Sequence, residues 1–255
     1  MQRDQLLSTL NQLLSPHLVK DYCPNGLQVE GKEEIHHIVT GVTASQALID
    51  HAIALDADAI LVHHGYFWKN EAYNIVGMKK RRIAALLQHD INLFAYHLPL
   101  DVHPTLGNNA QLAKLLALTE VTPVVDIAPE GVVMQGILPE AITHEQLSAR
   151  LQHALHRAPV SVGGSAQIKR VAWCTGGGQG FIDELVNLST DGCGIDAFIS
   201  GEISEQTTHS ARELGIDYFA AGHHATERYG VKAVGEHLAE NFGLKVSFVD
   251  IQNPA

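Results

Sequence analysis

Short apolar runs alternate along the chain with segments whose apolar residues recur every three or four positions. The short runs predict strands, and the three- to four-residue spacing predicts helices. The predicted strands are residues 37–41, 59–62, 92–96, 132–138, 170–174, 197–200, 218–221 and 245–249. The predicted helices are residues 45–55, 79–88, 108–116, 144–156, 181–188, 205–214 and 226–242. This alternation indicates an α/β protein in which helices cover sheets.

A weak internal repeat relates the two ends of this pattern. Residues 35–50 align with residues 168–183, strand on strand and loop on loop. The alignment continues through the next strand, so that His63 and His64 fall on Gly201 and Glu202. Generic similarity between two strand–loop–helix units is the competing explanation. The repeat predicts three parts, which are residues 1–120, a connecting β-plus-helix element at 121–167, and residues 168–255.

Composition describes an ordinary soluble core, with 45% apolar and 18% charged residues among 255. The net charge of −11 leaves no general surface for duplex nucleic acid or anionic lipid. The cysteines Cys23, Cys174 and Cys193 are scattered, which argues against a disulfide framework and a thiolate zinc site. No apolar run is long enough to cross a bilayer, and the N-terminal helix pattern has no cleavage site. We therefore expect a cytoplasmic protein.

Histidine is the unusual residue, with 16 copies in the chain, and several follow predicted strands. His63 and His64 follow one strand and precede Gly65, whose turn frees the two rings to point the same way. His97 follows the next strand, and Pro99 is expected to prevent an early helix before Asp101. In the second half, three residues follow the equivalent strand, namely His223, His224 and Glu227. Three strand ends thus supply imidazoles and carboxylates.

This donor set predicts the kind of metal. Nitrogen and oxygen ligands without thiolates favour zinc, iron(II) or manganese. Two carboxylates and several histidines exceed the needs of one tetrahedral zinc, so two divalent ions are the natural interpretation. The carboxylates lower the charge of the site, and bound water becomes nucleophilic near neutral pH. A hydrolytic reaction follows most simply.

Five segments together resemble the NIF-three-like family, also named the GTP cyclohydrolase 1 type 2 family. They are Pro24-Asn25-Gly26-Leu27-Gln28-Val29-Glu30-Gly31, His63-His64-Gly65, His97-Leu98-Pro99-Leu100-Asp101 with Gly107-Asn108, Gly201-Glu202-Ile203, and Gly222-His223-His224-Ala225-Thr226-Glu227. The resemblance covers nearly the whole chain. It implies two intertwined three-layer α/β/α lobes related by an internal pseudo-twofold repeat, a dinuclear metal centre and a ring-shaped homohexamer.

The resemblance also implies a ligand set. Carried over by position, the metal ligands are His63, His64, Asp101, His223 and Glu227. Glu227 is the expected bridging carboxylate. His97 aligns with His223 in the internal repeat and is expected to carry protons. The remaining histidines, His37 among them, are predicted to be solvated.

Three further segments each have two explanations. The glycine-rich stretch at residues 173–181 forms either a tight strand-to-helix turn or a phosphate cradle in which Gly177 and Gly178 contact substrate. Glu202 either lines the site or caps the following helix. Trp68 belongs to an aromatic segment that packs at the rim or at a subunit contact, or else provides a platform for a heterocyclic base.

These features favour a dinuclear metal-dependent hydrolase that acts on a small nucleotide-like or heterocyclic substrate, with two divalent ions per chain. The alternatives are a non-catalytic binding or scaffold protein stabilised by its metals, and a metal-handling protein that takes up and releases iron. A homo-oligomer and a small-molecule substrate are the expected partners; duplex nucleic acid and membranes are not.

Overall fold

The computed structural model describes residues 1–191 and 194–255, so Cys193 lies outside the described residues. The chain divides into two compact units. Unit 1 comprises Met1–Leu100 and Gly230–Gln252, and unit 2 comprises Asp101–Tyr229 and Asn253–Ala255. Each unit is considered by itself below.

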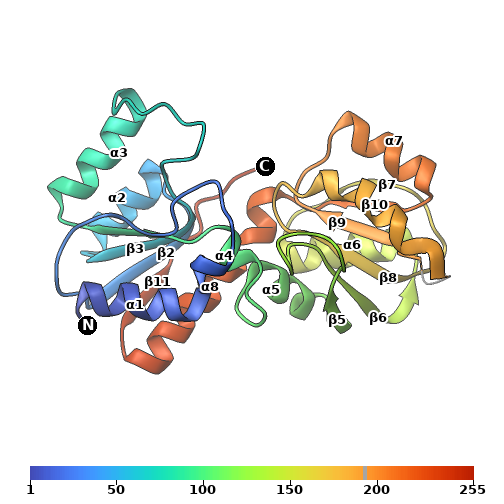
Figure 1. Ribbon diagram of the computed structural model, residues 1–255, viewed down its shortest axis with the longest axis horizontal. Coiled ribbons are helices and arrows are strands. Elements are labelled where there is room, and N and C mark those ends of the chain that lie inside the picture. Colours follow the sequence, from blue (N-terminus) through green and yellow to red (C-terminus); the bar gives the residue numbers. More distant parts are fainter. Residues whose placement is uncertain (192–193) are drawn as a thin grey trace. The chain divides into compact units, whose positions relative to one another are not determined.

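The chain passes between the units inside two helices. It leaves unit 1 at the end of α4 (Leu98–Asp101) and returns within α8 (His223–Phe242), as Figure 1 shows. The last residues of the chain then count with unit 2. Neither unit is therefore one continuous stretch of sequence, and the two are interleaved along the chain.

Unit 1 is built on a five-stranded sheet in the order β1, β4, β3, β2, β11. The strands are β1 (Gly26–Val29), β2 (His37–Thr43), β3 (Ala59–His64), β4 (Asn92–Ala95) and β11 (Lys245–Phe248). Neighbouring strands are parallel, except that β1 is antiparallel to β4 at the edge. Strands β3 and β4 are almost wholly buried, which explains their continuous apolar sequences.

Helices cover both faces of this sheet (Figure 1). They are α1 (Arg3–Leu14), the 3₁₀ turn η1 (Pro16–Leu18), α2 (Gln46–Ala54), α3 (Gly77–Gln88) and the second part of α8. The Ser45 side chain caps α2 by accepting a hydrogen bond from the backbone N–H of Leu48. Gly235 lets α8 approach the sheet closely, because a Cβ there would lie 2.9 Å from Val246 and 3.0 Å from Thr40.

Unit 2 is built on a six-stranded sheet in the order β5, β6, β8, β9, β10, β7. The strands are β5 (Thr119–Pro123), β6 (Met134–Ile142), β7 (Val160–Val162), β8 (Ile168–Trp173), β9 (Ala197–Ser200) and β10 (Asp217–Ala220). Strands β8, β9 and β10 are parallel, and the other pairs are antiparallel. This sheet is therefore mixed.

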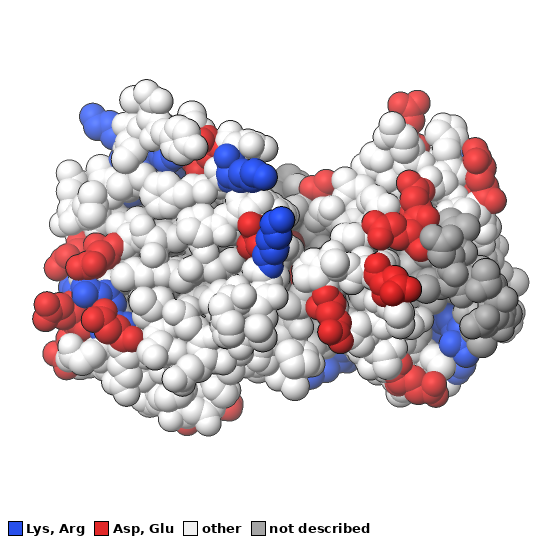
Figure 2. Space-filling view, viewed as in Figure 1, with Lys and Arg blue, Asp and Glu red and all other residues white. Residues whose placement is uncertain are grey.

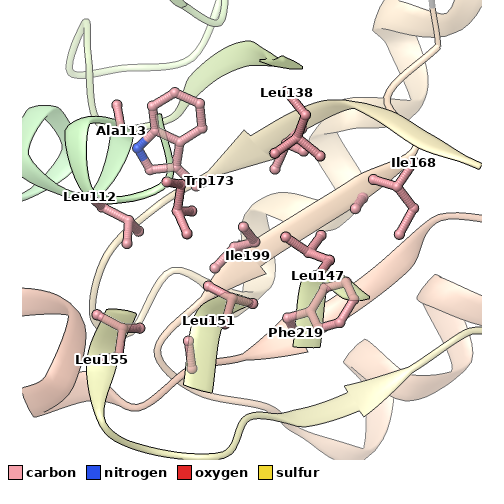
Figure 3. Packing of buried hydrophobic residues seen from close by; sticks show 14 of the residues in the cluster. Leu112, Ala113, Leu138, Leu147, Leu151, Leu155, Ile168, Trp173, Ile199 and Phe219 are labelled. Atoms are coloured by element: carbon pink, nitrogen blue, oxygen red, sulfur yellow. The ribbon is translucent and has the colours of Figure 1, made fainter. Parts of the chain in front are cut away.

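The helices of unit 2 are α5 (Asn108–Leu115), α6 (His144–Leu155), the 3₁₀ segment η2 (Gln179–Asp191), α7 (Glu205–Leu214) and the start of α8. A capping box between Thr143 and Gln146 begins α6. Its leucines pack against Trp173 and Phe219 of the sheet (Figure 3). The indole N–H of Trp173 donates to the carbonyl of Asn109, so the one polar atom of this ring is satisfied.

Unit 1 and unit 2 each contain three neighbouring parallel strands, β2–β3–β4 and β8–β9–β10. In both triplets the first two strands pair in the same register. Ile38 lies opposite Ala59 in unit 1, and Val171 lies opposite Ala197 in unit 2. These pairs are the ones that the sequence repeat aligns. An antiparallel strand flanks each triplet on the same side, β1 beside β4 and β7 beside β10.

One carboxylate holds the start of the first strand in each triplet. Asp58 accepts hydrogen bonds from the backbone N–H groups of His36 and His37 at 2.9 and 3.0 Å. Asp196 accepts from Lys169 and Arg170 at 2.8 and 2.7 Å. The acceptor and both donors coincide in the repeat, which extends the likeness from strand order to individual hydrogen bonds.

The predicted strands and helices are present, with shifted ends, and several details differ. Sequence patterns missed β1, β5 and β7, which are short, and β5 and β7 are largely exposed strands. The expectation that Pro99 prevents a helix was wrong, because α4 contains it at a first-turn position where proline is tolerated. The last helix begins at His223 rather than at Thr226. Residues 181–188 lie in the 3₁₀ segment η2 rather than in an α-helix.

Among the helices of the described residues, none has both the length and the apolar character required to cross a lipid bilayer.

Candidate functional site

His63 and His64 are the last two residues of β3, inside the strand rather than beyond it as predicted. His63 is completely buried, and its Nδ1–H donates to the carbonyl of Tyr96 at 3.1 Å. That bond selects the tautomer whose Nε2 carries the lone pair. The two rings lie with centroids 4.5 Å apart, so both occupy one region of unit 1. The structure thus brings these two imidazoles together at the end of β3.

His97 follows β4 and joins the same cluster. Its ring centroid lies 5.0 Å from that of His63 and 5.7 Å from that of His64. One nitrogen of each of the three rings lies within 4.8 Å of the others, a spacing that suits ligands of one metal ion. Unit 1 thus brings together three of the sequence-predicted site residues.

Asp21 fixes the orientation of His97 and was missed by the sequence analysis. Its carboxylate accepts the Nδ1–H of His97 at 3.0 Å and the backbone N–H of Leu98 at 3.0 Å. Asn25 donates to Asp21 and accepts the backbone N–H of His97 at 2.8 Å. The family-like Asn25-Gly26 segment therefore holds the end of β4. The sequence did contain one sign of this role, because an acidic residue, Asp21, stands four residues before Asn25.

The hydrogen bonds and charges around Asp21 favour its ionised form. Burial alone would raise its pKa, but hydrogen bonds from His97, Asn25 and the Tyr22 backbone, with the charge of His97, lower the pKa to about 2. Because the ionised Asp21 accepts the Nδ1–H of His97, Nε2 is the nitrogen left to face the cluster. Histidines that bind metals or transfer protons are held in the same way. Cys23 lies close enough to Asp21 and His97 to form a second group of potential ligands.

In unit 2, His223 opens α8 and contacts two carboxylates. Its Nδ1 lies 2.7 Å from Oε1 of Glu202, and its Nε2 lies 3.1 Å from Oε2 of Glu227. Burial of His223 opposes its protonation, but these two carboxylates outweigh that effect and raise its pKa to about 9. Glu202 therefore contacts a site residue, one of the two roles that the sequence left open.

Asp101 and Glu227 are both buried carboxylates of unit 2, only 6% and 3% exposed. Asn108 donates to Asp101 at 2.8 Å, which gives the Gly107-Asn108 segment a positioning role. Burial and the charges of Asp101 and Glu227 together raise the pKa of the Cys174 thiol. Both carboxylates therefore act on the same strand end, where β8 leads into Thr175.

The glycine-rich stretch after β8 lets the backbone lie close to the side chains of His223 and Glu227. Gly176 has a φ of +66°, and a Cβ at that position would overlap the Glu227 carboxylate and lie 3.1 Å from Nε2 of His223. Its N–H donates to the hydroxyl of Thr226 at 3.0 Å. A Cβ at Gly178 would overlap Cys174. These contacts favour a tight turn against His223 and Glu227.

Some other histidines differ from expectation. His37 was predicted to be solvated, but it is 5% exposed and contacts Leu55 and Ser247. Burial and the charge of Lys245 lower its pKa, so it is a neutral core residue. His144 is also buried and bonds to Asp217 at 2.7 Å, where it ties α6 to β10. These rings satisfy local polar groups.

The donor chemistry fits divalent cations. Unit 1 offers three imidazoles, and unit 2 offers an imidazole with two buried carboxylates, so nitrogen and oxygen donors dominate. Zinc, iron(II) and manganese accept such ligands, whereas copper(I) favours sulfur. Acidic side chains predominate over the visible surface of unit 2 in Figure 2. That surface favours cations over polyanions.

Comparison with known proteins gives a consistent result. Residues 1–254 match the family described as Duf34/NIF3 (NGG1p interacting factor 3). The GTP cyclohydrolase 1 type 2 homolog of Vibrio cholerae is 58% identical over 253 residues, which cover 98% of each chain. A solved structure of protein ybgI, described as of unknown function, has a TM-score of 0.94 at 52% identity. TTHA1606 from Thermus thermophilus has a TM-score of 0.89 at 35% identity, and both alignments cover each chain completely.

Proposed function

The chain belongs to the Duf34/NIF3 family, and from that premise we propose that it is a metal-dependent hydrolase. Its metal ligands are His63, His64, Asp101, His223 and Glu227, which hold two divalent ions per chain. Its substrate is a small nucleotide-like or heterocyclic molecule. Relatives named GTP cyclohydrolase 1 type 2 homolog support the substrate class.

One observation carries the proposal, namely that a carboxylate orients one histidine in each unit. Asp21 holds Nδ1 of His97, and Glu202 holds Nδ1 of His223. Carboxylates on the outer nitrogen are characteristic of histidines that bind metals or transfer protons, because they fix both the tautomer and the ring orientation. The Asp21–His97 pair is buried, where desolvation makes a charged pair costly.

The roles of the residues follow from their surroundings. Divalent ions bound here supply a Lewis acid and lower the pKa of water towards neutrality. Asp101 and Glu227 reduce the charge of the site, and Asn108 holds Asp101 by donating a hydrogen bond to it. His97 moves the proton between water and the leaving group through its Nε2, while Asp21 holds its Nδ1.

Metal analysis of purified protein tests the ligand set. We expect two divalent ions per wild-type chain and fewer than one in Glu227→Gln, because the amide is a poor bridging ligand. A matched control is Glu236→Gln, further along α8 and outside the ligand set. Two ions retained in Glu227→Gln would contradict the assignment of Glu227.

Activity separates the enzyme from its alternatives. A screen of nucleotides, pterin-like heterocycles, phosphoesters and peptides should reveal hydrolysis that disappears in His97→Ala while metal content persists. If no compound is turned over, and His63→Ala only lowers thermal stability or disperses the oligomer, the chain is a metal-stabilised scaffold. Rapid metal exchange without turnover would instead indicate metal handling.

We also propose a homo-oligomer, in which a ring-shaped hexamer is the form that the family resemblance implies. Several large apolar side chains of unit 1 are exposed, and burial in a subunit contact would explain them. They are Tyr73, Ile75, Val76 and Met78. Sedimentation equilibrium tests the proposal, and a monomer at micromolar concentration would refute it.

A further inference from the structure

Two aromatic rings stand beside the histidine cluster of unit 1. Tyr22 is 52% exposed, and its ring centroid lies 5.8 Å from that of Trp68. Each ring meets His97 edge-on, with centroids 5.0 Å away and interplanar angles of 70° and 85°. Trp68 also lies 6.0 Å from His64. The pair therefore forms an aromatic surface in direct contact with proposed site residues.

The loop that carries Trp68 is held rigidly from several sides. The Gln28 side chain accepts the N–H of Tyr66 and donates to its carbonyl. The carboxylate of Glu71 accepts from the backbone N–H groups of Phe67 and Trp68 at 2.6 and 3.1 Å. Phe67 has a φ of +67°, a conformation that costs a non-glycine residue about 1 kcal/mol or more. Strain maintained by so many contacts indicates a surface organised in advance.

The segment that carries Trp68 differs in charge from the whole chain. Five of the 17 basic residues fall within residues 66–82, where Glu71 is the single acid, although the chain has a net charge of −11. One of them, Lys69, follows Trp68 directly, and its backbone N–H donates to the carbonyl of Tyr22 at 2.8 Å. Blue side chains lie over the region of α3 in Figure 2. This neighbourhood suits a ligand with anionic groups.

We propose that Tyr22 and Trp68 form a stacking surface for the planar heteroaromatic ring of an anionic, nucleotide-type substrate. The inference rests on the proposed function and names the groups that select its substrate. A ring inserted between two others needs them about 7 Å apart, twice the optimal contact distance. The observed 5.8 Å is too short. The substrate ring therefore stacks on the outward faces of the pair, next to the histidine cluster.

Trp68 itself can report on this binding. The chain has two tryptophans, and Trp173 is fully buried in the core of unit 2, so a stacking ligand changes the emission of Trp68. We expect saturable quenching by GTP and, more weakly, by guanosine, which lacks the phosphates. Inorganic triphosphate, which has no ring, should leave the emission unchanged. Absence of saturable quenching by both ring-containing probes would overturn the proposal.

Variants of Tyr22 test where the ring of the ligand binds. Stacking contributes roughly 1–3 kcal/mol per base, so Tyr22→Ala should weaken GTP binding about tenfold or more, and Tyr22→Phe should restore it. Phe242→Ala is the matched control, because Phe242 is an exposed aromatic residue at the end of α8, outside the proposed subunit contact. Unchanged affinity in Tyr22→Ala overturns the proposal. So does a change of oligomer size with unchanged ring affinity, which would make the pair a subunit contact.

The outcomes separate this inference from the proposed function. Ring binding that depends on Tyr22, without metal-dependent hydrolysis of any probe, supports the stacking surface and counts against the hydrolase. Metal-dependent hydrolysis with an unchanged KM in Tyr22→Ala supports the hydrolase and overturns the stacking surface.

Discussion

The two parallel strand triplets have the same framework and different chemistry. Their first two strands pair in the same register, and Asp58 and Asp196 hold equivalent backbone groups. The ends of the middle strands differ, because β3 ends in His63 and His64 whereas Gly201 and Glu202 follow β9. Equivalent backbones therefore present imidazoles in unit 1 and a carboxylate in unit 2.

The source of the orienting carboxylate also differs. In unit 1 it is Asp21, which lies 76 residues before His97 in a loop outside the triplet. In unit 2 it is Glu202, which follows the neighbouring strand and lies 21 residues before His223. The comparison shows that framework positions and site positions are set by separate residues. Substitutions at paired positions can therefore test each separately.

The largest expected contrast is between Gly176 and Thr43, which the repeat aligns. Gly176→Ala forces a side chain into the left-handed region and against the Glu227 carboxylate. We expect a loss of about 2–4 kcal/mol in the free energy of unfolding, from backbone strain and overpacking together. Thr43→Ala should lower the free energy of unfolding by less than about 1 kcal/mol, because it removes atoms and creates no steric overlap. Urea denaturation measures both, and equal losses would contradict this account of the glycine.

The framework carboxylates should give matched effects. Asp58→Ala and Asp196→Ala each remove a charged acceptor from two backbone N–H groups, so each should cost about 1.5–3 kcal/mol. Asp58 also pairs with Lys32, whose side chain is 36% exposed, and that pair adds little. Chemical denaturation of both variants should give values within about 1 kcal/mol of each other. A larger difference would mean that the two triplets are not energetically equivalent.

The orienting carboxylates should affect metal binding or turnover more than folding. Asp21→Asn and Glu202→Gln keep the shape of the side chain but weaken control of the histidine tautomer. Glu202→Gln, which acts through the ligand His223, should lower metal affinity about 10- to 100-fold with little change in the unfolding midpoint. Asp21→Asn, which acts through His97, should lower turnover and leave the metal content unchanged. Competition with a chromophoric chelator measures the affinity. Glu205→Gln, on α7 close in sequence to Glu202, is the control.

The smallest expected contrast is a pH dependence at the start of the third strands. Asp217 begins β10, and Asn92 begins β4 at the equivalent ladder position. Burial raises the pKa of Asp217, but hydrogen bonds from His144, Ser165 and Gly164 outweigh it and lower the pKa. Its ionised form therefore stabilises unit 2 above about pH 4, the ordinary pKa of aspartate, and this stabilisation is lost as the pH falls through the lower folded value.

Thermal melts between pH 2.5 and 6 measure this effect. Wild-type protein should lose stability on acidification, and Asp217→Asn should give a flatter curve with a lower plateau near pH 6. Asp4→Asn is the control, because that side chain is 84% exposed. Identical pH profiles for wild type and Asp217→Asn would show that this carboxyl does not contribute.

Periodicity was sufficient to find the buried parts of the fold. The strands of both triplets are apolar and central, so their sequences carry the pattern that burial imposes. The repeat aligned Ile38 with Val171 and Ala59 with Ala197, and the structure shows that these residues form equivalent ladder pairs. Edge strands such as β7, with three residues and little burial, carry no such pattern. Their place is set by hydrogen bonds to a neighbour rather than by their own composition.

The site was predictable where its residues fall on strand ends. His63, His64 and His97 were found because they follow apolar runs, and the structure groups them in unit 1. Asp21 could not be found this way, since its partner lies 76 residues away and its loop has no periodic pattern. The burial of His37 was missed for a related reason, because its partner Ser247 belongs to a strand formed more than 200 residues later.

The interleaved path of the chain has a consequence for biosynthesis. Strand β2 is paired on one side by β11, which leaves the ribosome long after β2 does. Until then the N-terminal sheet has an open parallel edge, a surface that invites aggregation. A nascent chain stalled after Leu100 would hold most residues of unit 1 without its covering strand. We expect C-terminal truncations to be insoluble, and a circular permutant that joins the two ends of unit 1 to be the soluble way to isolate it.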